Sequence, residues 1–248
     1  MRLVSLCPSI SESIISLGRA DALVGVTRFC IHPEDVTAKV RKVGGTKDPQ
    51  IDRIVELRPD LVFVNEEENR REDFDALQAA GIEVDVSMTR RLQQVPDQLR
   101  HVGARIQAEA MAEQRATELE AELATLEAAR GLRDTAFSFA YLIWRGPWMA
   151  VGADTYVADL LSSAGGLNVL AEQPERYPEV TLDKLQALKP DVVFLPDEPF
   201  PFGPKHVPEV QAALPQAQIH LVSGDDCCWH GVRSLRGARL ATFFAKTL

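Results

Sequence analysis

The sequence predicts an α/β fold in which two Rossmann-like lobes with parallel sheets are joined by one long backbone helix, with a ligand cleft between the lobes. Two observations lead to this expectation. The chain contains an internal repeat, because IDRIVELRPDLVFV (51–64) and LDKLQALKPDVVFL (182–195) match in residue type at most positions. Helical and strand patterns also alternate around both copies, as they do in parallel α/β domains.

Each copy of the repeat predicts a short amphipathic helix that ends at a proline before a buried strand. Pro59 and Pro190 mark this boundary, and an aspartate follows each of them. The runs LVFV and VVFL that come next are continuously apolar, which is typical of parallel strands covered on both faces.

The other elements are expected in a similar order in both halves. Ser9 is expected to cap the first helix and Gly18 to end it. In the first half the pattern predicts a strand at 2–7, a helix at 9–18, a strand at 23–27, a helix at 73–81 and a strand at 82–87. In the second half it predicts a strand at 136–143, a helix at 155–166, and strands at 192–195 and 219–223.

The segment 108–130 is rich in Ala, Glu and Leu and contains neither proline nor glycine. It predicts a single helix of roughly 30 Å, at about 1.5 Å per residue. An ordinary surface helix is the alternative, but the position between the repeats favours a helix that joins two lobes. The expected organisation is therefore an N-terminal lobe at 1–107, the interlobe helix at 108–130 and a C-terminal lobe at 131–248.

The composition excludes several classes of protein. With 248 residues, of which 46% are hydrophobic, the chain is long and apolar enough to bury a core. Its formal net charge of −9 provides no basic surface for nucleic acid or anionic lipid. No stretch approaches the roughly 20 apolar residues of a membrane span, so no direct membrane insertion is expected.

The cysteines and the first residues predict where the protein resides. Four cysteines are too few for a disulfide scaffold, so reduced thiols are expected. The start, MRLVSLCPS, lacks the long apolar region of a secretory signal, which predicts a cytoplasmic protein. The alternative is a periplasmic protein from which a signal peptide was removed. A monomer is expected.

The default ligand site of such a fold lies beyond the carboxyl ends of its strands. Aromatic residues make up only 6% of the chain, yet all three tryptophans fall in loops that follow predicted strands. This grouping favours a role for at least one of them in covering a large, flat ligand. The aromatic residues in these loops are Phe29, Trp144, Trp148, Phe200, Phe202 and Trp229.

Thiol and imidazole side chains lie in the same loops. Cys30 and His32 in one half, and Cys227, Cys228 and His230 in the other, are weak candidates for a metal site, because both groups suit zinc, copper or iron. The alternative is that Cys30 and Cys227 are small buried residues and that His32 caps a turn. His230 is the expected ligand contact of this set.

Charged residues in the loops offer a second kind of contact. The segment NEEENRRE (65–72) has the composition of a solvated charge run, but it follows a buried strand. Its glutamates Glu66, Glu67 and Glu68 are candidate acceptors for amide groups of a ligand, and Glu68 is the one expected to bind. Arg145 is a candidate partner for a carboxylate or phosphate, and Arg90 and Arg91 extend this set for an anionic chelate.

Six segments, specific in this order and spacing, form a recognisable pattern. They are VSLCPSISESIISLG (4–18), LVGVTRFCIHP (23–33), DRIVELRPDLVFV (52–64), the 108–130 helix, GPWMAVGADTYVADLLSSAGGLNVL (146–170) and YPEVTLDKLQALKPDVV (177–193). The chain resembles, over its whole length, the class III helical-backbone metal receptors, which include vitamin B12-binding and iron-siderophore-binding proteins of bacterial ABC importers. The B12-binding branch is the nearest.

The resemblance implies a small-molecule metal chelate, within the B12 branch a corrinoid, held between lobes that move little. By position it implies aromatic pocket roles for Phe29, Trp148, Tyr177 and Trp229. It also implies that the second lobe docks on an ABC permease through Asp183. In the first lobe the position equivalent to Asp183 is occupied by Arg71, and the acidic residue next to it is Glu72. Asn65 and Val86 stand where that branch has tryptophans.

The leading expectation is a binding protein and not an enzyme, with no intrinsic cofactor. Neither a nucleophile elbow nor a phosphate-binding or zinc-protease motif occurs in a suitable context. The alternatives are a receptor for a siderophore or free metal ion, and an enzyme acting on a corrinoid or tetrapyrrole through Cys30 or His230. The expected ligand-binding residues are Phe29, Cys30, His32, Glu68, Trp144, Arg145, Trp148, Tyr177, Trp229 and His230, and the expected permease-docking residues are Glu72 and Asp183.

Overall fold

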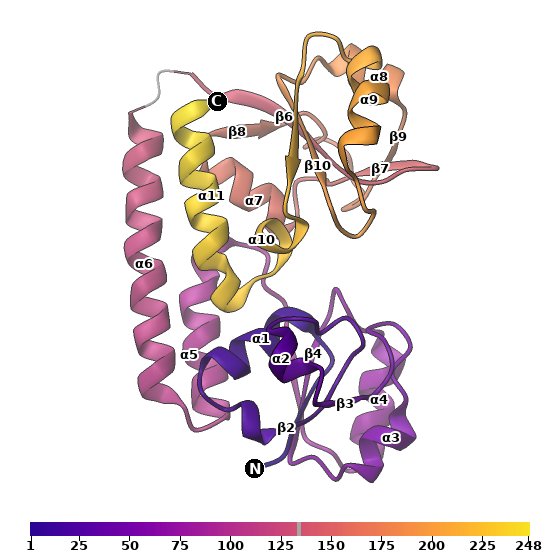
Figure 1. Ribbon diagram of the computed structural model, residues 1–248, viewed down its shortest axis with the longest axis vertical. Coiled ribbons are helices and arrows are strands. Elements are labelled where there is room, and N and C mark those ends of the chain that lie inside the picture. Colours follow the sequence, from indigo (N-terminus) through magenta and orange to yellow (C-terminus); the bar gives the residue numbers. More distant parts are fainter. Residues whose placement is uncertain (133–134) are drawn as a thin grey trace. The chain divides into compact units, whose positions relative to one another are not determined.

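The computed structural model describes residues 1–132 and 135–248. The chain folds into two compact units, whose elements are labelled in Figure 1. Unit 1 comprises Met1–Thr89, Gln94–Glu118 and His230–Arg233. Unit 2 comprises Arg90–Gln93, Leu119–Trp229 and Ser234–Leu248. Each unit contains one sheet with helices packed on it, so the predicted α/β class is confirmed.

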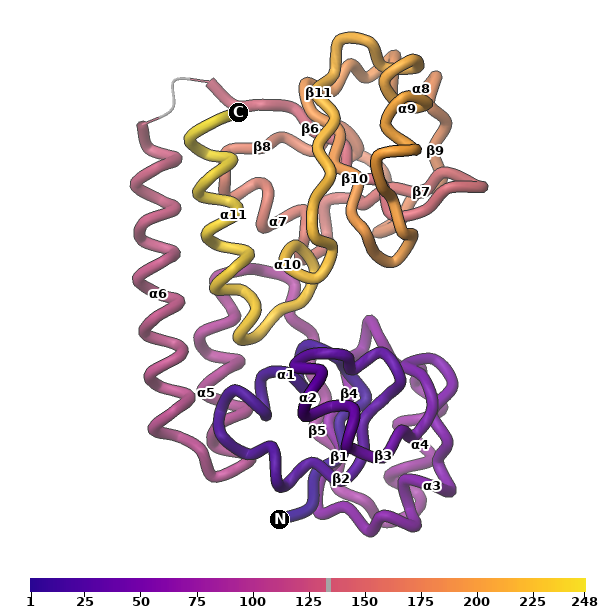
Figure 2. Tube along the Cα trace, in the orientation of Figure 1, coloured from indigo at the N-terminus to yellow at the C-terminus, as the bar shows by residue number. Residues whose placement is uncertain are grey.

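Unit 1 contains a five-stranded parallel sheet in the order β3-β2-β1-β4-β5. Figure 2 labels these five strands along the Cα trace. Its strands are β1 (Leu3–Ser5), β2 (Leu23–Val26), β3 (Arg41–Lys42), β4 (Leu61–Asn65) and β5 (Val84–Ser87). Its helices are α1 (Pro8–Ser16), α2 (Glu34–Thr37), α3 (Ile51–Glu56), α4 (Arg71–Ala79) and α5 (Val95–Arg105). Short 3-10 helices cover Ala20–Ala22 and Gly231–Arg233. A third, Leu92–Gln94, has its first two residues in unit 2 and its last in unit 1.

The core of unit 1 lies on both faces of this sheet. Leu3 and Phe63 pack on one face in a cluster that includes residues of α1 and α5. Val4 and Val62 pack on the other face with residues of α3 and α4. The continuous apolar run LVFV of β4 therefore has the reason that the sequence predicts, because a parallel strand covered by helices on both sides needs apolar residues on both faces.

Unit 2 contains a sheet in the order β11-β10-β6-β7-β9, with β8 paired to β6. Its strands are β6 (Phe137–Trp144), β7 (Trp148–Ala150), β8 (Gly166–Asn168), β9 (Glu179–Val180), β10 (Val192–Pro196) and β11 (Gln218–Val222). Its helices are α7 (Tyr156–Ser163), α8 (Leu182–Leu188), α9 (Val207–Ala213), α10 (Gly224–Cys228) and α11 (Ser234–Thr247), with a 3-10 helix at Pro204–His206.

The expectation of a purely parallel sheet is wrong for unit 2. β10, β11, β6 and β8 are parallel, but β7 runs antiparallel to β6 and β9 runs antiparallel to β7. The cause is local: the chain reverses through Arg145–Pro147, where Gly146 has φ +79°, so that Trp148 starts a strand beside the one it follows. The segment 144–149, predicted as a loop, is therefore a hairpin.

The predicted repeat is confirmed in its elements and in their details. α3 and β4 in unit 1 correspond to α8 and β10 in unit 2. Arg58 and Lys189, which precede the two prolines, both adopt left-handed conformations, with φ of 46° and 52°. The aspartates after the prolines have equivalent roles: Asp60 accepts a hydrogen bond from the backbone N–H of Arg2 (2.6 Å), and Asp191 accepts one from that of Ser138 (2.7 Å).

The start of the first helix differs from the expectation. Cys7 occupies the N-cap position of α1, without a side-chain cap, and Pro8 is the first helical residue. Proline favours this position because its fixed φ suits the first turn and its missing N–H is not needed there. Ser9 is therefore inside the helix, and its Oγ lies 3.2 Å from Sγ of Cys7.

The predicted long helix is confirmed as α6 (Glu109–Gly131), which is 23 residues long and continues from unit 1 into unit 2. Its buried positions recur at helical spacing. They are Ala112 and Ala116 in unit 1, and Leu119, Leu126 and Ala129 in unit 2. The predicted bounds of the lobes and the predicted cleft stay predictions, and residues 133–134 of the C-terminal lobe lie outside the described residues. In the described ranges, no helix is both long enough and apolar enough to cross a membrane.

Candidate functional site

An aromatic cluster forms at the carboxyl ends of β6 and β10 in unit 2. Trp148 stacks on Phe202, with ring centroids 6.0 Å apart and planes inclined by 5°. Phe200 lies 4.7 Å from Phe202 and meets Trp144 edge to face at 5.6 Å. The loop after β10 folds back on β6, because the N–H of Phe200 donates to the carbonyl of Ile143 (3.3 Å). Rings from two predicted loops are thus brought together.

This cluster, defined as Trp144, Trp148, Phe200, Phe202 and His206, has a buried base and an exposed rim. Phe202 is 5% exposed and Trp144 is 41% exposed. His206, which the sequence analysis did not select, meets Phe200 and Phe202 edge to face and accepts a hydrogen bond at Nδ1 from the N–H of Gly203 (3.0 Å). Such a surface can cover a flat apolar ligand.

The arginines predicted to bind anions are engaged in ion pairs. Arg145 binds Glu209 through Nε and Nη2, at 2.8 and 3.1 Å, and its guanidinium lies 5.9 Å from the Trp148 ring. Arg90 pairs with Asp154 at 3.1 Å. Arg91 pairs with Asp159 at 3.0 Å. Each predicted anion contact therefore already has a carboxylate partner in unit 2.

Trp229 follows α10, and its position is fixed by a carboxyl group after β10. The indole Nε1–H of Trp229 donates to Oε1 of Glu198 at 2.7 Å, and only 9% of Trp229 is exposed. Burial, reinforced by a hydrogen bond with Asp225, raises the pKa of Glu198 to about 8. Trp229 could be expected at this edge from its place after a strand, whereas Glu198, 31 positions away in the sequence, was not predicted.

Tyr177 lies apart from this cluster in the chain, just before β9. The strand that follows it pairs with β7, through Val180 opposite Trp148. Tyr177 is 36% exposed, and the guanidinium of Arg176 lies 5.9 Å from the centre of its ring. Whether Tyr177 contacts a ligand stays a prediction.

The RFCIHP loop of unit 1 presents one ring and buries one thiol. Phe29 is 47% exposed and lies under the guanidinium of Arg28 at 4.8 Å. Cys30 is 1% exposed, with Sγ 3.0 Å from Oγ of Ser11 and 3.2 Å from Oγ1 of Thr27. His32, two positions after Cys30 in the sequence, is half-buried. Burial raises the pKa of the Cys30 thiol.

The NEEENRRE segment begins with a turn that two asparagines organise. Oδ1 of Asn65 accepts hydrogen bonds from the backbone N–H groups of Glu67 and Glu68, at 3.0 and 3.2 Å. Oδ1 of Asn69 in turn accepts a hydrogen bond from the backbone N–H of Asn65, at 2.8 Å. Glu68 is half-buried, and desolvation raises its pKa, against the lowering effect of Lys47. The charge pattern of this segment does not predict the turn, although the spacing of Asn65 and Asn69 is a signal for one, because asparagine side chains bind nearby backbone groups.

His230 belongs to unit 1, where it is 7% exposed within a polar network. Its Nδ1 lies 2.7 Å from Nε2 of Gln98, and its Nε2 lies 3.4 Å from both Oγ of Ser9 and Nδ2 of Asn65. Burial lowers the pKa of His230 to about 4. The imidazole is therefore neutral near pH 7. Ser9 and His230 are 221 positions apart, so their contact was not predicted from the sequence.

The remaining candidates are placed as follows. Cys227 is fully buried, and burial raises its pKa to about 12. Cys228 is half-buried, with Sγ 3.7 Å from the hydroxyl of Tyr141. Glu72 and Asp183 are both exposed in the first turns of α4 and α8. Within the described part of the chain, no three His, Cys, Asp or Glu side chains gather as metal ligands.

The thiols are expected to differ sharply in reactivity. Native protein at pH 8 should react with Ellman's reagent rapidly at Cys228 alone, because burial excludes the reagent from Cys7, Cys30 and Cys227 and raises the pKa of each. All four should react in denaturant. Absorbance at the thiolate product's wavelength measures both phases, and a fast phase that persists in Cys228→Ser would contradict the assignment.

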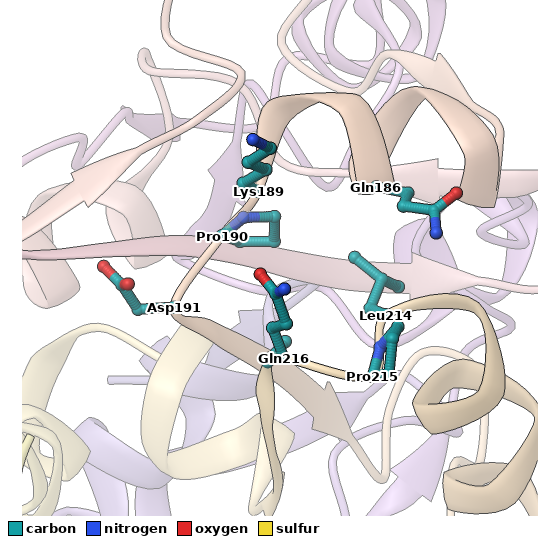
Figure 3. A pocket seen from close by; sticks show the side chains of 8 residues that line it. Gln186, Lys189, Pro190, Asp191, Leu214, Pro215 and Gln216 are labelled. Carbon is teal, nitrogen blue, oxygen red and sulfur yellow. The ribbon is translucent and has the colours of Figure 1, made fainter.

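A pocket lies at the opposite end of the unit 2 sheet. It has a volume of about 220 Å³ and is formed at the amino ends of β10 and β11 (Figure 3). Its lining residues are Gln186, Lys189, Pro190, Asp191, Leu214, Pro215, Gln216 and Ala217. Asp191 is already used there to bind Ser138, and ligands of open α/β sheets gather at the carboxyl ends. The aromatic cluster at the carboxyl ends, and not this pocket, is therefore the candidate site.

Comparison with known proteins places these features in a family. Residues 3–199 match the family described as Periplasmic binding protein. The Vitamin B12-binding protein of Vibrio campbellii is 24% identical over 193 residues, which cover 78% of this chain and 70% of that protein.

Solved structures show the same fold. The crystal structure of the periplasmic vitamin B12 binding protein BtuF of Vibrio cholerae has a TM-score of 0.87 at 20% identity and covers 99% of this chain and 96% of that one. The periplasmic heme-binding protein RhuT from Roseiflexus sp. RS-1, in its apo form, has a TM-score of 0.83 at 21% identity. The match covers 99% of this chain and 97% of that one.

These findings bear on two expectations from the sequence. The resemblance to class III receptors is confirmed. The periplasmic alternative is favoured by the family and by the relatives, and the cytoplasmic expectation is not supported. Because the match covers most of the chain, this protein belongs to the periplasmic binding protein family.

Proposed function

We propose that this chain is a periplasmic substrate-binding protein that delivers its cargo to an ABC permease. The proposed cargo is a cobalamin-like corrinoid or a related metal chelate. Proteins of this family are substrate-binding components of transporters and not enzymes. The relatives described above bind vitamin B12 or heme, which supports a planar metal macrocycle as the cargo class. The chain is proposed to act as a monomer that recognises its cargo without altering it.

The aromatic cluster of unit 2 is the observation that carries this proposal. Trp148 stacked on Phe202, with Trp144 and Phe200 beside them, offers a broad apolar surface at the carboxyl edge of the sheet. Large rings gain binding free energy from such contact roughly in proportion to the apolar area removed from water. Phe29, Tyr177 and Trp229 are proposed as further aromatic contacts, and Glu72 and Asp183 as contacts with the permease.

The charges near this edge favour a cargo with amide groups over an anionic chelate. Arg145 is already paired with Glu209, so binding a cargo carboxylate there would require breaking that pair. Asp197, Asp225 and Asp226, which follow β10 and β11, add negative charge. Amide side chains, which a corrinoid carries, donate hydrogen bonds to carboxylates, whereas heme propionates and many siderophores would be repelled.

The proposal is tested by offering the purified protein cobalamin, heme and a ferric siderophore. Cobalamin is expected to co-elute with the protein in gel filtration, to give a saturable heat in titration calorimetry, and to be recovered chemically unchanged. Tighter binding of heme or of the ferric siderophore would contradict the preference for an amide-rich cargo. Recovery of an altered corrinoid would instead support the enzyme alternative.

Removing one ring of the cluster should weaken cargo binding selectively. Trp148→Ala is expected to raise the Kd for cobalamin by about 10- to 100-fold, the range for a buried aromatic contact at the centre of a binding surface. Phe243→Ala is the matched control, because Phe243 is a 55% exposed ring on α11, outside the cluster. Calorimetry on both variants, after circular dichroism has shown intact folds, measures the difference. Equal Kd values for the two would exclude the cluster as the site.

Metal ligation by the cysteines predicts a different pattern. Cys227→Ser removes a buried thiol and leaves the rings in place. The aromatic proposal expects this variant to bind cobalamin as the unaltered chain does. A loss of binding in Cys227→Ser together with normal binding in Trp148→Ala would favour metal ligation.

A further inference from the structure

Two pairs of acidic residues come together where neighbouring strands of unit 2 end. β10 and β11 are parallel, with Pro196 opposite Val222 at their carboxyl ends. Asp197 and Glu198 follow the first strand, and Asp225 and Asp226 lie in the first turn of α10 after the second. Two of these carboxyl groups bind parts of α10: Asp197 accepts the N–H of Gly224 at 2.7 Å, and Glu198 hydrogen-bonds Asp225.

The carboxyl group of Glu198 also reaches the tryptophan at the end of the same helix. Its Oε1 accepts the indole N–H of Trp229 at 2.7 Å, while the backbone N–H of Trp229 donates to the carbonyl of Asp225 at 2.9 Å. The indole, Glu198 and Asp225 therefore form one connected set.

Close packing holds Glu198 in this place. A Cβ atom built on Gly224 would lie 2.5 Å from Cγ, 2.8 Å from the carbonyl oxygen and 3.0 Å from the backbone nitrogen of Glu198. Only glycine leaves room for α10 to start directly against this residue. The arrangement is thus built from the backbone as well as from the side chain, because the start of α10 lies in close contact with both the backbone and the side chain of Glu198.

The charges around Glu198 decide its protonation. The groups that face it are Asp225 on α10 and the adjacent Asp197, both acidic, together with the neutral indole of Trp229. A second ionised carboxylate beside Asp225 in a largely buried position is costly, so burial first and Asp225 second raise the pKa of Glu198 to about 8. At pH 7 the protonated carboxyl can donate to Asp225 with one oxygen and accept from Trp229 with the other.

We propose that Glu198 is a positioning residue: its carboxylic acid bridges the carboxylate of Asp225 and the indole of Trp229, and thereby fixes the Trp229 ring in the orientation that contacts the cargo. This inference rests on the proposed function, because it assigns the ring to cargo binding. Ionisation of Glu198 removes the donor to Asp225 and places two negative charges together. Cargo affinity therefore falls as the pH rises through the ionisation of this one group.

The test compares the pH dependence of the cobalamin Kd in three proteins between pH 6 and 9.5. The unaltered chain is expected to bind about 3- to 10-fold more weakly at pH 9.5 than at pH 6, the range for losing one hydrogen bond. Glu198→Gln, whose amide accepts from Trp229 and donates to Asp225 without a titrating proton, should bind like the unaltered chain at pH 6 and keep that affinity at pH 9.5. Glu198→Ala, which offers no acceptor, should be about 10-fold weaker at every pH.

The bridge is measured separately by NMR in the protein without cargo. The indole N–H signal of Trp229, identified by its loss in Trp229→Phe, should shift with a midpoint near pH 8 in the unaltered chain and stay constant in Glu198→Gln. Parallel pH profiles of Kd in these two proteins, normal binding by Glu198→Ala, or an indole signal that does not titrate would each overturn the inference. If cobalamin does not bind at any pH, the cargo proposal fails, while the NMR titration still decides whether Glu198 positions the ring.

Discussion

Replacing Arg233 by alanine is expected to lower the free energy of unfolding by about 3–5 kcal/mol. Arg233 binds Glu12 through Nε and Nη2, each at 2.7 Å, and the two side chains are only 5% and 16% exposed. The variant would leave the Glu12 carboxylate buried without its partner. The cost is that of desolvating an uncompensated charge, which is much larger than the net value of most ion pairs.

Two variants distinguish this cause from the loss of any arginine. Arg41→Ala removes an exposed pair with Glu56, 53% and 64% exposed, and should cost less than about 1 kcal/mol. Arg233→Met combined with Glu12→Leu removes both charges and should recover most of the stability lost in Arg233→Ala. Urea unfolding followed by circular dichroism measures all three. A cost for Arg233→Ala no greater than that for Arg41→Ala would show that the buried pair contributes little.

Much of the fold could be predicted because its signals are local in sequence. The repeat at 51–64 and 182–195 contains its own helix, proline and buried strand, so periodicity within 14 residues was enough to identify them. The helix α6 was equally clear, since its composition allows little else. By contrast, the antiparallel direction of β7 depended on a turn at Gly146, and a pattern of apolar residues does not report strand direction.

The candidate site was predictable as a set of residue types but not as a set of contacts. Aromatic residues after strands could be expected at the carboxyl edge, and Trp144, Trp148, Phe200 and Phe202 do meet there. Their polar partners are set by packing between distant segments. Arg145 and Glu209 are 64 positions apart, so no local pattern could show that the predicted anion contact is already paired. His206 and Glu198 were missed for the same reason.

The segment His230–Arg233 shows this limit most clearly. It follows α10, yet the chain contributes these four residues to unit 1 and returns to unit 2 at Ser234. Its contacts span more than 200 positions: His230 meets Ser9, the N–H of Val232 donates to Oγ of Ser13, and Arg233 binds Glu12. A histidine expected to face a ligand is therefore also part of the packing of unit 1.

The burial of His230 leads to the second large effect. The free energy of unfolding should fall as the pH drops below about 6.5, and His230 should account for a separate, measurable part of that fall. The folded state holds His230 neutral, with its pKa lowered to about 4 by burial, whereas the unfolded chain protonates it near 6.5. A lowered pKa gives stability that is fully present above pH 6.5 and is lost as the pH falls toward 4. The slope from one such group is at most about 1.4 kcal/mol per pH unit.

His230→Gln isolates this contribution, because an amide can bind Gln98 and Ser9 without taking up a proton. The free energy of unfolding, measured by urea titration at pH 7, 6, 5 and 4, should fall more steeply in the unaltered chain than in the variant. The comparison uses the difference in slope, so a constant packing cost of the substitution does not affect it, and carboxylates that protonate in both proteins cancel. Equal slopes would mean that His230 is protonated in the folded state near its ordinary pKa, and therefore that its ring is open to water or to a ligand and not enclosed by Ser9, Asn65 and Gln98.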